Sequence, residues 1–313
     1  MATQSTRFDT TTNRDLLKEG TIRKLFDTTS ESTPQYYKEL VNDLTWDEYT
    51  FRDQRIGGLT PAGEIVEGEG IPLQIPVLGT SKTYTQRRFG TGFRMTEAMN
   101  RFNQYGLWQK NAKALGRMQK ICKDEEVHVL FNDPTSIVLT CGVGYDTLAL
   151  ASNAHTGLLA GSTADNYDNL LSADLSTSAL ESAWYYFRTL IDDMGHLRSV
   201  IPSHLVFEPT LYFTASEIWK SSDKAHQLSN TTNVIPSAFK GLKLYEDPML
   251  TSTTMWFMLA KGDDLFDINV FTAQEPDLVI GDAPDTTRDR MATSQQWFTY
   301  GWGDPRAYYL GKA

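Results

Sequence analysis

The sequence has few cysteines, no long apolar run and no catalytic signature. Two cysteines in 313 residues, Cys122 and Cys141, cannot form a disulfide framework, and we interpret both as small buried hydrophobic residues rather than a disulfide. No apolar stretch approaches the roughly 18 residues that span a bilayer, and the N-terminal residues contain no secretory-type apolar segment. We therefore expect a soluble protein that is made in the cytoplasm and does not enter a membrane.

Basic charge is also scarce. The 29 lysines and arginines are outnumbered by 39 acidic residues, which gives a formal net charge of -10. Proteins that read a nucleic-acid sequence usually present a basic face, so this balance argues against such a reader. The acidic charge is compatible with a protein that encloses DNA without binding it tightly. At 40% apolar and 22% charged residues the composition is that of a globular protein, and the length predicts about two domains.

Patterns that carry catalysis or bind metals are absent from the sequence. The five histidines show no metal-ligand spacing, no G-x-S-x-G nucleophile elbow occurs, and no phosphate-binding glycine loop is complete. Two acidic groups could hold a hard cation, but a solvated acidic surface explains them better; they are Glu64, Glu67 and Glu69, and Asp165 with Asp168. We predict no catalytic residue, no metal and no cofactor.

Glycine and proline are concentrated in one segment. Residues 57–92 contain eight of the 22 glycines, a density that forbids a helix. Short β-type runs at 64–67, 71–78 and 83–93 predict a long two-stranded hairpin. An isolated hairpin has only marginal stability in water. It is either a pair of edge strands folded back on its own domain or an arm on a neighbouring subunit.

A long helix is predicted directly after this segment. Thr96 can cap it, and Asn132-Asp133-Pro134 can end it after about 36 residues, or roughly 50 Å. Gly106 and Gly116 are plausible bend points. Apolar residues at steps of mostly three and four predict one buried face, namely Met95, Met99, Phe102, Tyr105, Trp108, Ala112, Leu115, Met118, Cys122 and Val129.

The other predicted elements are shorter. Residues 1–33 are polar with one helical piece, and form either a frayed tail or an arm that orders on a neighbour. Further along we predict a helix from the Ser178/Glu181 capping box to Gly195, a strand at 204–207, a helix around 212–219, strands near 242–245, 254–260 and 265–271, and two strands within 290–310 around a turn at 301–305. Helices and strands are segregated, so we predict an α+β fold.

Four segments follow one another in a characteristic order. They are RRFGTGFRMTEAM (87–99), the helix-then-strand passage at 176–209, LKLYEDPML (242–250) followed by Trp256, and GWGDPRAYY (301–309). With the glycine-rich arm and the long helix, this order resembles the major capsid proteins of tailed double-stranded DNA bacteriophages, the fold typified by the Hong Kong ninety-seven phage capsid. The resemblance covers essentially the whole chain.

The resemblance implies a particular organisation. An N-terminal arm would occupy 1–50, an extended loop over the adjacent subunit 51–93, a peripheral domain with the spine helix 94–169 and again 259–300, and an axial domain 170–258 with the C-terminal strands 301–313. The protein would self-assemble into hexamers and pentamers of an icosahedral virion shell around double-stranded DNA, in the cytoplasm of a bacterial host. A separate scaffolding protein and a portal are expected partners, and a decoration protein is left open.

Loop position and charge complementarity lead us to predict inter-subunit contacts at Phe8, Arg55, Glu64, Glu67, Lys82, Arg87 and Arg88. Lys82 is the one lysine between Asp53 and Phe93, and we favour an ordinary surface lysine over a covalent crosslink to a residue such as Asn269. Two other functions stay open. One is an encapsulin-type shell with the same fold and a different cargo. The other is a monomeric hydrolase or carbohydrate-binding protein, against which the missing motifs argue.

Overall fold

A computed structural model describes residues 10–59, 61–76, 78–97, 107–139, 141–155, 167–221, 232–282 and 289–312. The chain divides into two compact units. Unit 1 combines residues 1–35, 87–125 and 272–298, and unit 2 combines residues 36–86, 126–271 and 299–313. Each unit is therefore built from three separate stretches of sequence.

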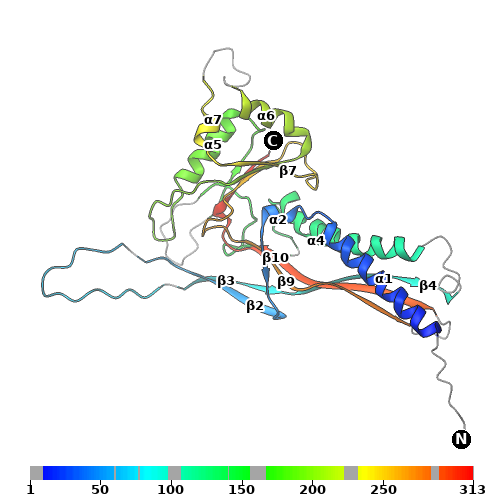
Figure 1. The fold of residues 1–313 in the computed structure, drawn as a ribbon. Coiled ribbons are helices and arrows are strands. Elements are labelled where there is room, and N and C mark those ends of the chain that lie inside the picture. Colours follow the sequence, from blue (N-terminus) through cyan, green and yellow to red (C-terminus); the bar gives the residue numbers. More distant parts are fainter. Residues whose placement is uncertain are drawn as a thin grey trace, which may run out of the picture. The chain divides into compact units, whose positions relative to one another are not determined.

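The elements mix helices and strands as predicted (Figure 1). The helices are α1 (Thr10–Ser32), α2 (Tyr37–Leu40), α4 (Leu107–Asn132), α5 (Thr177–Arg188), α6 (Tyr212–Lys220) and α7 (Ile235–Ala238), with short 3₁₀ turns at Pro209–Leu211 and Pro305–Ala307. The strands are β1 (Asn42–Thr45), β2 (Thr50–Ile56), β3 (Leu78–Thr85), β4 (Arg87–Met95), β5 (Leu170–Leu171), β6 (His204–Phe207), β7 (Lys243–Glu246), β8 (Trp256–Leu259), β9 (Ile268–Asp282), β10 (Arg290–Trp302) and β11 (Tyr308–Gly311).

The strands form three sheets. Their orders are β1-β9-β10-β4, β5-β11-β8-β6-β7 and the pair β2-β3. The five-stranded sheet is mixed, since β6 runs parallel to β7 and antiparallel to β8. Every residue of β6, β8 and β11 is buried, which explains why these strands are mostly apolar and do not alternate with polar residues. The mixture of helices with a mixed sheet confirms the predicted α+β class.

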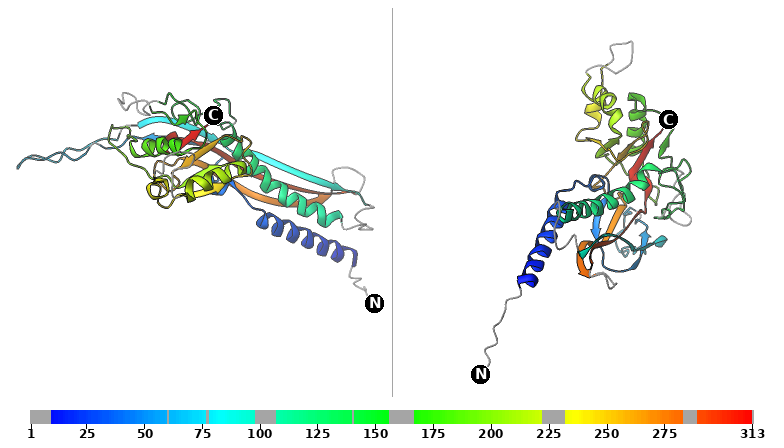
Figure 2. Two further views of the ribbon diagram at one scale, coloured as in Figure 1. Left: turned by 90° about the horizontal axis from the view of Figure 1, so that it is seen from above. Right: turned by 90° about the vertical axis from the view of Figure 1, so that its right-hand side faces the viewer.

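Unit 1 has its own apolar core, in which helices pack against the long strands (Figure 2). Ile22 and Phe26 of α1 join Trp108, Ala112 and Leu115 of α4 in one buried cluster with residues of β4, β9 and β10. Polar contacts continue the same interface: Gln119 donates to the Ser294 carbonyl, and Gln296 donates to the Gln119 carbonyl, each at 2.8 Å.

The long helix ends at Asn132, as its Asn-Asp-Pro signal predicts, and its described part begins at Leu107. Gly106 and the stretch 98–106 lie outside the described residues, together with Met99, Phe102 and Tyr105. The predicted face was wrong at Met118 and Val129, which are exposed. Gln119 and Lys123 are buried instead, because both side chains find polar partners on β9 and β10.

Three further sequence predictions were wrong. Residues 64–67 and 71–76 form no strand, and the hairpin is made by β2 and β3, because the glycines and prolines between them leave that chain without ladder partners. The predicted strand at 83–93 is two strands that join different sheets. The helix at 177 ends at Arg188 rather than near Gly195; Ser176 caps it by accepting from the Ala179 amide at 3.2 Å, and Gly195 lies in a later turn with φ of +84°.

Gly116 permits a close approach between α1 and α4, and its replacement by alanine tests this contact. An added Cβ would lie 2.7 Å from the Phe26 carbonyl oxygen, a backbone atom that cannot rotate away. We expect Gly116→Ala to destabilise unit 1 by about 1–3 kcal/mol, measured by thermal or urea unfolding. Gly20→Ala is the matched control in α1, since nothing lies within 4 Å of its Cβ position; we expect it to stabilise by about 0.5–1 kcal/mol. Equal effects of the two variants would contradict the account.

Candidate assembly site at the root of the hairpin

The β2–β3 hairpin is a two-stranded sheet of its own. Its register pairs Phe51 with Tyr84 and Asp53 with Lys82, and the Gln86 amide closes its root by donating to the Tyr49 carbonyl at 2.8 Å. Every second side chain of β2 is partly buried against the rest of unit 2, and the side chains between them are exposed, as the two-residue period of a strand requires. The hairpin is therefore attached to unit 2 by side chains, in three successive layers that lead from the root towards the tip.

The first layer is aromatic. The rings of Phe51 and Tyr84 stack across the strands with centroids 5.0 Å apart. Both rings also contact Phe271, at 4.5 and 5.0 Å. Such pairs contribute about 0.5–1.5 kcal/mol beyond the apolar area that they bury, so this layer holds both strands of the hairpin against the start of β9.

The second layer is polar. Lys82 is only 7% exposed, donates to the Trp302 carbonyl at 2.9 Å, and lies over the Trp302 and Tyr84 rings at 4.6 and 4.9 Å. Asp53 accepts a hydrogen bond from the Tyr145 hydroxyl at 2.5 Å. Burial lowers the pKa of Lys82 to about 8, although Cys141, Asp267 and Asp53 oppose this shift.

Two residues next to this layer are Gly301, near the end of β10, and Asp267, just before β9. A Cβ on Gly301 would lie 2.7 Å from the Lys82 Nζ, so a side chain there would displace the ammonium group. Burial, and then the charge of Asp53, raise the pKa of Asp267 to about 6. Gly301 thus lies close to Lys82 because it has no side chain.

The third layer is ionic and contains four residues, which we call the Arg55 cluster: Arg55, Asp193, Asp304 and Arg306. Arg55 donates to Asp193 at 2.7 Å and pairs with Asp304. Arg306 contacts the same two carboxylates, at 3.0 Å for Asp193 and 2.7 Å for Asp304. Burial raises the pKa of Asp304 to about 7, while Arg55 opposes that rise. The two cations and two anions alternate, so each charge has two partners of opposite sign.

Beyond the β2–β3 pairing the chain of unit 2 continues as a loop. Figure 1 shows residues 61–76 extending well beyond the ends of β2 and β3. Apolar side chains in this loop face solvent, including Ile71, Ile75 and Leu73, which is 93% exposed. The segment 56–81 contains three glutamates and no lysine or arginine. An exposed, connected set of large apolar residues marks an interaction surface.

The predicted contact residues are distributed over several places. Glu64 and Glu67 are exposed in the loop, and Phe8 lies outside the described residues. Arg87 and Arg88 belong to β4 of unit 1, where their guanidinium groups lie over the Phe89 and Trp297 rings at 4.9 and 5.9 Å.

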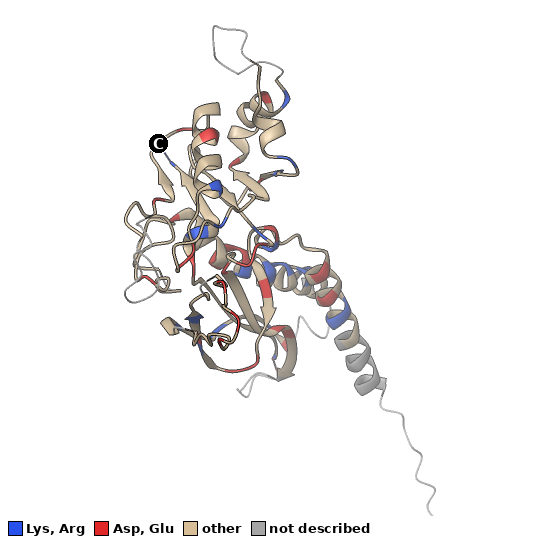
Figure 3. Cartoon of the chain, turned by 90° about the vertical axis from the view of Figure 1, so that its left-hand side faces the viewer, with Lys and Arg blue, Asp and Glu red and all other residues tan. Residues whose placement is uncertain are grey.

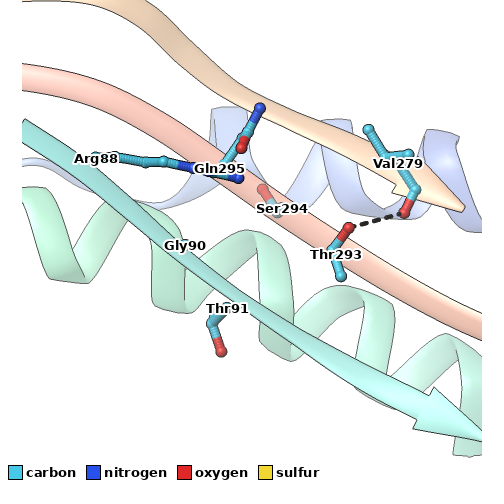
Figure 4. Close-up of a pocket in the computed structure, with 7 residues that line it drawn as sticks. All are labelled: Arg88, Gly90, Thr91, Val279, Thr293, Ser294 and Gln295. Atoms are coloured by element: carbon cyan, nitrogen blue, oxygen red, sulfur yellow. Dashed lines mark hydrogen bonds between the residues drawn. The ribbon is translucent and has the colours of Figure 1, made fainter. Parts of the chain in front are cut away.

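Arg88 and Gly90 also line a pocket of about 600 Å³ (Figure 4). Val279, Thr293 and Gln295 complete this part of the lining, and the Thr293 hydroxyl donates to the Val279 carbonyl at 3.5 Å. The inter-subunit role of Arg87, Arg88, Glu64 and Glu67 stays a prediction.

For Arg55 and Lys82 the structure gives a different placement. Both are held within their own chain, so the expectation that Lys82 is a surface lysine was wrong. Asn269, the conceivable crosslinking partner, instead donates to Asp267 at 2.6 Å and accepts from Asn42 at 3.1 Å. Arg55 and Lys82 thus attach the hairpin within their own chain, and their inter-subunit role, like that of Phe8, stays a prediction.

Sequence reasoning missed the partners of these two residues. Asp193, Asp304, Arg306 and Tyr145 were not selected, because their distance from the hairpin along the chain gives no local pattern. One signal was present: Asp304 and Arg306 interrupt an apolar stretch at 297–310, and charged residues in such a place need partners.

Within the described ranges no three His, Cys, Asp or Glu side chains are placed to hold a metal ion. Asp165, a member of the second acidic group, lies outside them. In the same ranges no helix combines the length and the apolarity that crossing a membrane would need.

Comparison with known proteins decides the family. The profile of a family described as phage capsid protein matches residues 79–310, which is most of the chain. The chain belongs to the phage capsid protein family. The role of this capsid protein is structural rather than enzymatic, and it self-associates into the shell of a virion.

Solved structures agree on the fold of this capsid protein. The capsid structure of the cyanophage P-SCSP1u matches with a TM-score of 0.59 at 10% identity, covering 90% of this chain and 88% of that one. Microbacterium phage Oxtober96 matches with a TM-score of 0.55 at 10% identity, over 90% and 91%. A virus-like particle from Pyrococcus furiosus matches with a TM-score of 0.52 at 11% identity, over 93% and 97%. The search of curated protein sequences returned no match.

The lowered pKa of Lys82 predicts how the stability of the capsid protein depends on pH. Between about pH 8 and 10.5 the unfolded state binds more protons at this lysine than the folded state, so its contribution to stability increases as the pH rises through this range. We expect wild type to gain on the order of 3 kcal/mol relative to Lys82→Met over the full interval, with most of the gain above pH 8. Urea unfolding of both proteins at pH 7.5, 8.5 and 9.5 measures this difference; a constant difference would contradict the burial of a charged Lys82.

Proposed function

We propose that the protein is the major head subunit of a tailed bacteriophage, and that it assembles into hexamers and pentamers of an icosahedral shell around double-stranded DNA. The observation that carries this proposal is the loop 57–76, whose apolar side chains are exposed in the single chain. A neighbouring subunit of the same capsomer would cover them. Burial of apolar surface at a standard-sized interface, repeated around each subunit, would then stabilise the shell.

The charge of the chain supports enclosure of DNA without adhesion. With a net charge of -10 the subunit has no excess of cations to neutralise phosphates. In Figure 3 acidic and basic residues are interspersed along the chain, including on α1 and α4, rather than sorted by sign. A genome held inside such a wall could be wound tightly without binding to it.

Further parts of the proposal follow the resemblance. We propose a separate scaffolding protein and a portal as partners, with a decoration protein left open, and assembly in the cytoplasm of the bacterial host. We also propose the division into an N-terminal arm (1–50), extended loop (51–93), peripheral domain (94–169 and 259–300) and axial domain (170–258 and 301–313). An encapsulin-type shell shares the fold, but the family match favours a phage capsid.

Replacing residues 61–76 by a short Gly-Ser linker tests the function of the loop. Every residue of this segment is exposed, so we expect the melting temperature of the subunit to change little. Without the loop we expect closed shells to be lost, as seen by negative-stain electron microscopy and by elution volume. The measurement compares the variant with wild type, each co-expressed with scaffolding protein.

A variant of unchanged length separates the apolar contacts from the length of the loop. Ile71, Leu73 and Ile75, all strongly exposed, are replaced together by serine. We expect the same loss of closed shells, because the apolar area that the neighbour would bury is removed. Normal shells from both variants would contradict the proposed function of the loop.

A further inference from the structure

The direction of the loop depends on how its two strands are held. Within the described residues β2 and β3 have no third strand beside them, so no backbone ladder fixes the hairpin against the rest of unit 2. A hairpin of two strands is marginal alone and pivots readily unless side chains hold it. The last attachment by a side chain therefore decides the direction in which the loop 57–76 extends from the hairpin.

Arg55 makes the last attachment by a side chain. The register of the hairpin shifts between Gln54, which pairs with Ser81, and Ile56, which pairs with Leu78. One residue of β2, Arg55, thus lies opposite two residues of β3, Gly79 and Thr80, and an extra residue of this kind bends its own strand and increases the local twist of the pair. After it Ile56 is exposed. Gly57 is buried and the Cβ position of Gly58 lies 3.6 Å from Met194, but neither glycine has a side chain, so Arg55 is the last residue of β2 that a side chain attaches to the rest of unit 2.

The contacts of Arg55 come from two other segments of unit 2. Asp193 belongs to the loop after α5, and Asp304 belongs to the turn between β10 and β11. The side chain of Arg55 is 15% exposed, and those of its two partners are 5% and 1% exposed. Buried, charge-assisted contacts to two carboxylates allow few orientations of a guanidinium group, and water and salt screen them little.

The remaining residues of the cluster do not need Arg55 to keep their place. Arg306 contacts Asp304 through Nε and Nη2, contacts Asp193 through Nη2, and donates to the Ile191 carbonyl at 2.9 Å. Removing Arg55 therefore leaves both aspartates with a cation. Arg55 is the one member of the cluster that belongs to the hairpin, so its loss acts on the attachment of the hairpin more than on the fold of unit 2.

We propose that Arg55, held between Asp193 and Asp304, fixes the orientation of the β2–β3 hairpin and thereby sets the direction in which the loop 57–76 reaches a neighbouring subunit. Arg55 is thus a positioning residue for assembly and does not itself touch the neighbour. The inference rests on the proposed function of the loop. A hairpin without this contact would still form, but it would sample several directions, and subunits would join at inconsistent angles.

The test compares Arg55→Gln with Arg52→Gln. Arg52 is an arginine of the same strand, exposed, whose Nε donates to Ser81 at 2.8 Å within the hairpin. In the unassembled subunit we expect Arg55→Gln to speed hydrogen exchange of the β2 and β3 amides at least tenfold, while amides of β6 and β8 stay as in wild type. With scaffolding protein present we expect fewer closed shells and a wider spread of diameters. Arg52→Gln should match wild type in both measurements.

Arg55→Lys keeps the test decisive if Arg55→Gln fails to fold. Lysine retains the charge but cannot present the two-pronged geometry of a guanidinium group. We therefore expect the amides of the hairpin to exchange hydrogen at a rate between that of wild type and the tenfold increase. Exchange at the wild-type rate in every foldable Arg55 variant would overturn the role of Arg55 in holding the hairpin. Faster exchange with normal shells would overturn its role in assembly. If wild type itself forms no shells, the proposed function fails, while the exchange measurement still tests the attachment of the hairpin.

Discussion

Attachment of a two-stranded hairpin by side chains alone is the constraint on which the assembly surface depends. In the described residues β2 and β3 pair only with each other. The side chains of Phe51, Lys82 and Arg55 therefore hold the hairpin in place of the backbone hydrogen bonds that a third strand would supply. Burying Lys82 and Arg55 costs desolvation free energy, which partners must offset. Removing one partner of a buried ion pair typically costs about 3–5 kcal/mol, so the attachment is specific and sensitive to substitution.

Specific contacts also hold the helices of unit 1. Gly116 lets α1 approach α4 until backbone atoms nearly touch, and Lys123 reaches Thr272 at 2.8 Å beneath the Phe298 ring. A long helix with buried polar residues is thereby fixed in one register against the sheet, because every buried polar group needs its own partner. In both units a few directional contacts thus position these elements in addition to the apolar area that they bury.

The sequence predicted the elements whose signals are local. Apolar runs identified β6, β8 and β11, the Asn-Asp-Pro signal placed the end of α4 at Asn132, and the Gly-Trp-Gly-Asp-Pro turn separated β10 from β11. It did not predict the partners of Arg55, which lie 138 and 249 residues away. Lys82 was expected at the surface because lysine is rarely buried, and the β-type runs at 64–67 and 71–76 form no strand because a strand needs a partner as well as suitable residues.

A cryo-electron microscopy map of the assembled shell tests the central claim most directly, because it shows the hairpin and its contacts in every subunit. The account predicts density for the Arg55 guanidinium group between Asp193 and Asp304 of the same chain, with the loop 57–76 leaving at one common angle and resting on a neighbour. An Arg55 that reaches across to carboxylates of an adjacent subunit, or a hairpin that leaves at different angles while the cluster stays intact, would contradict it.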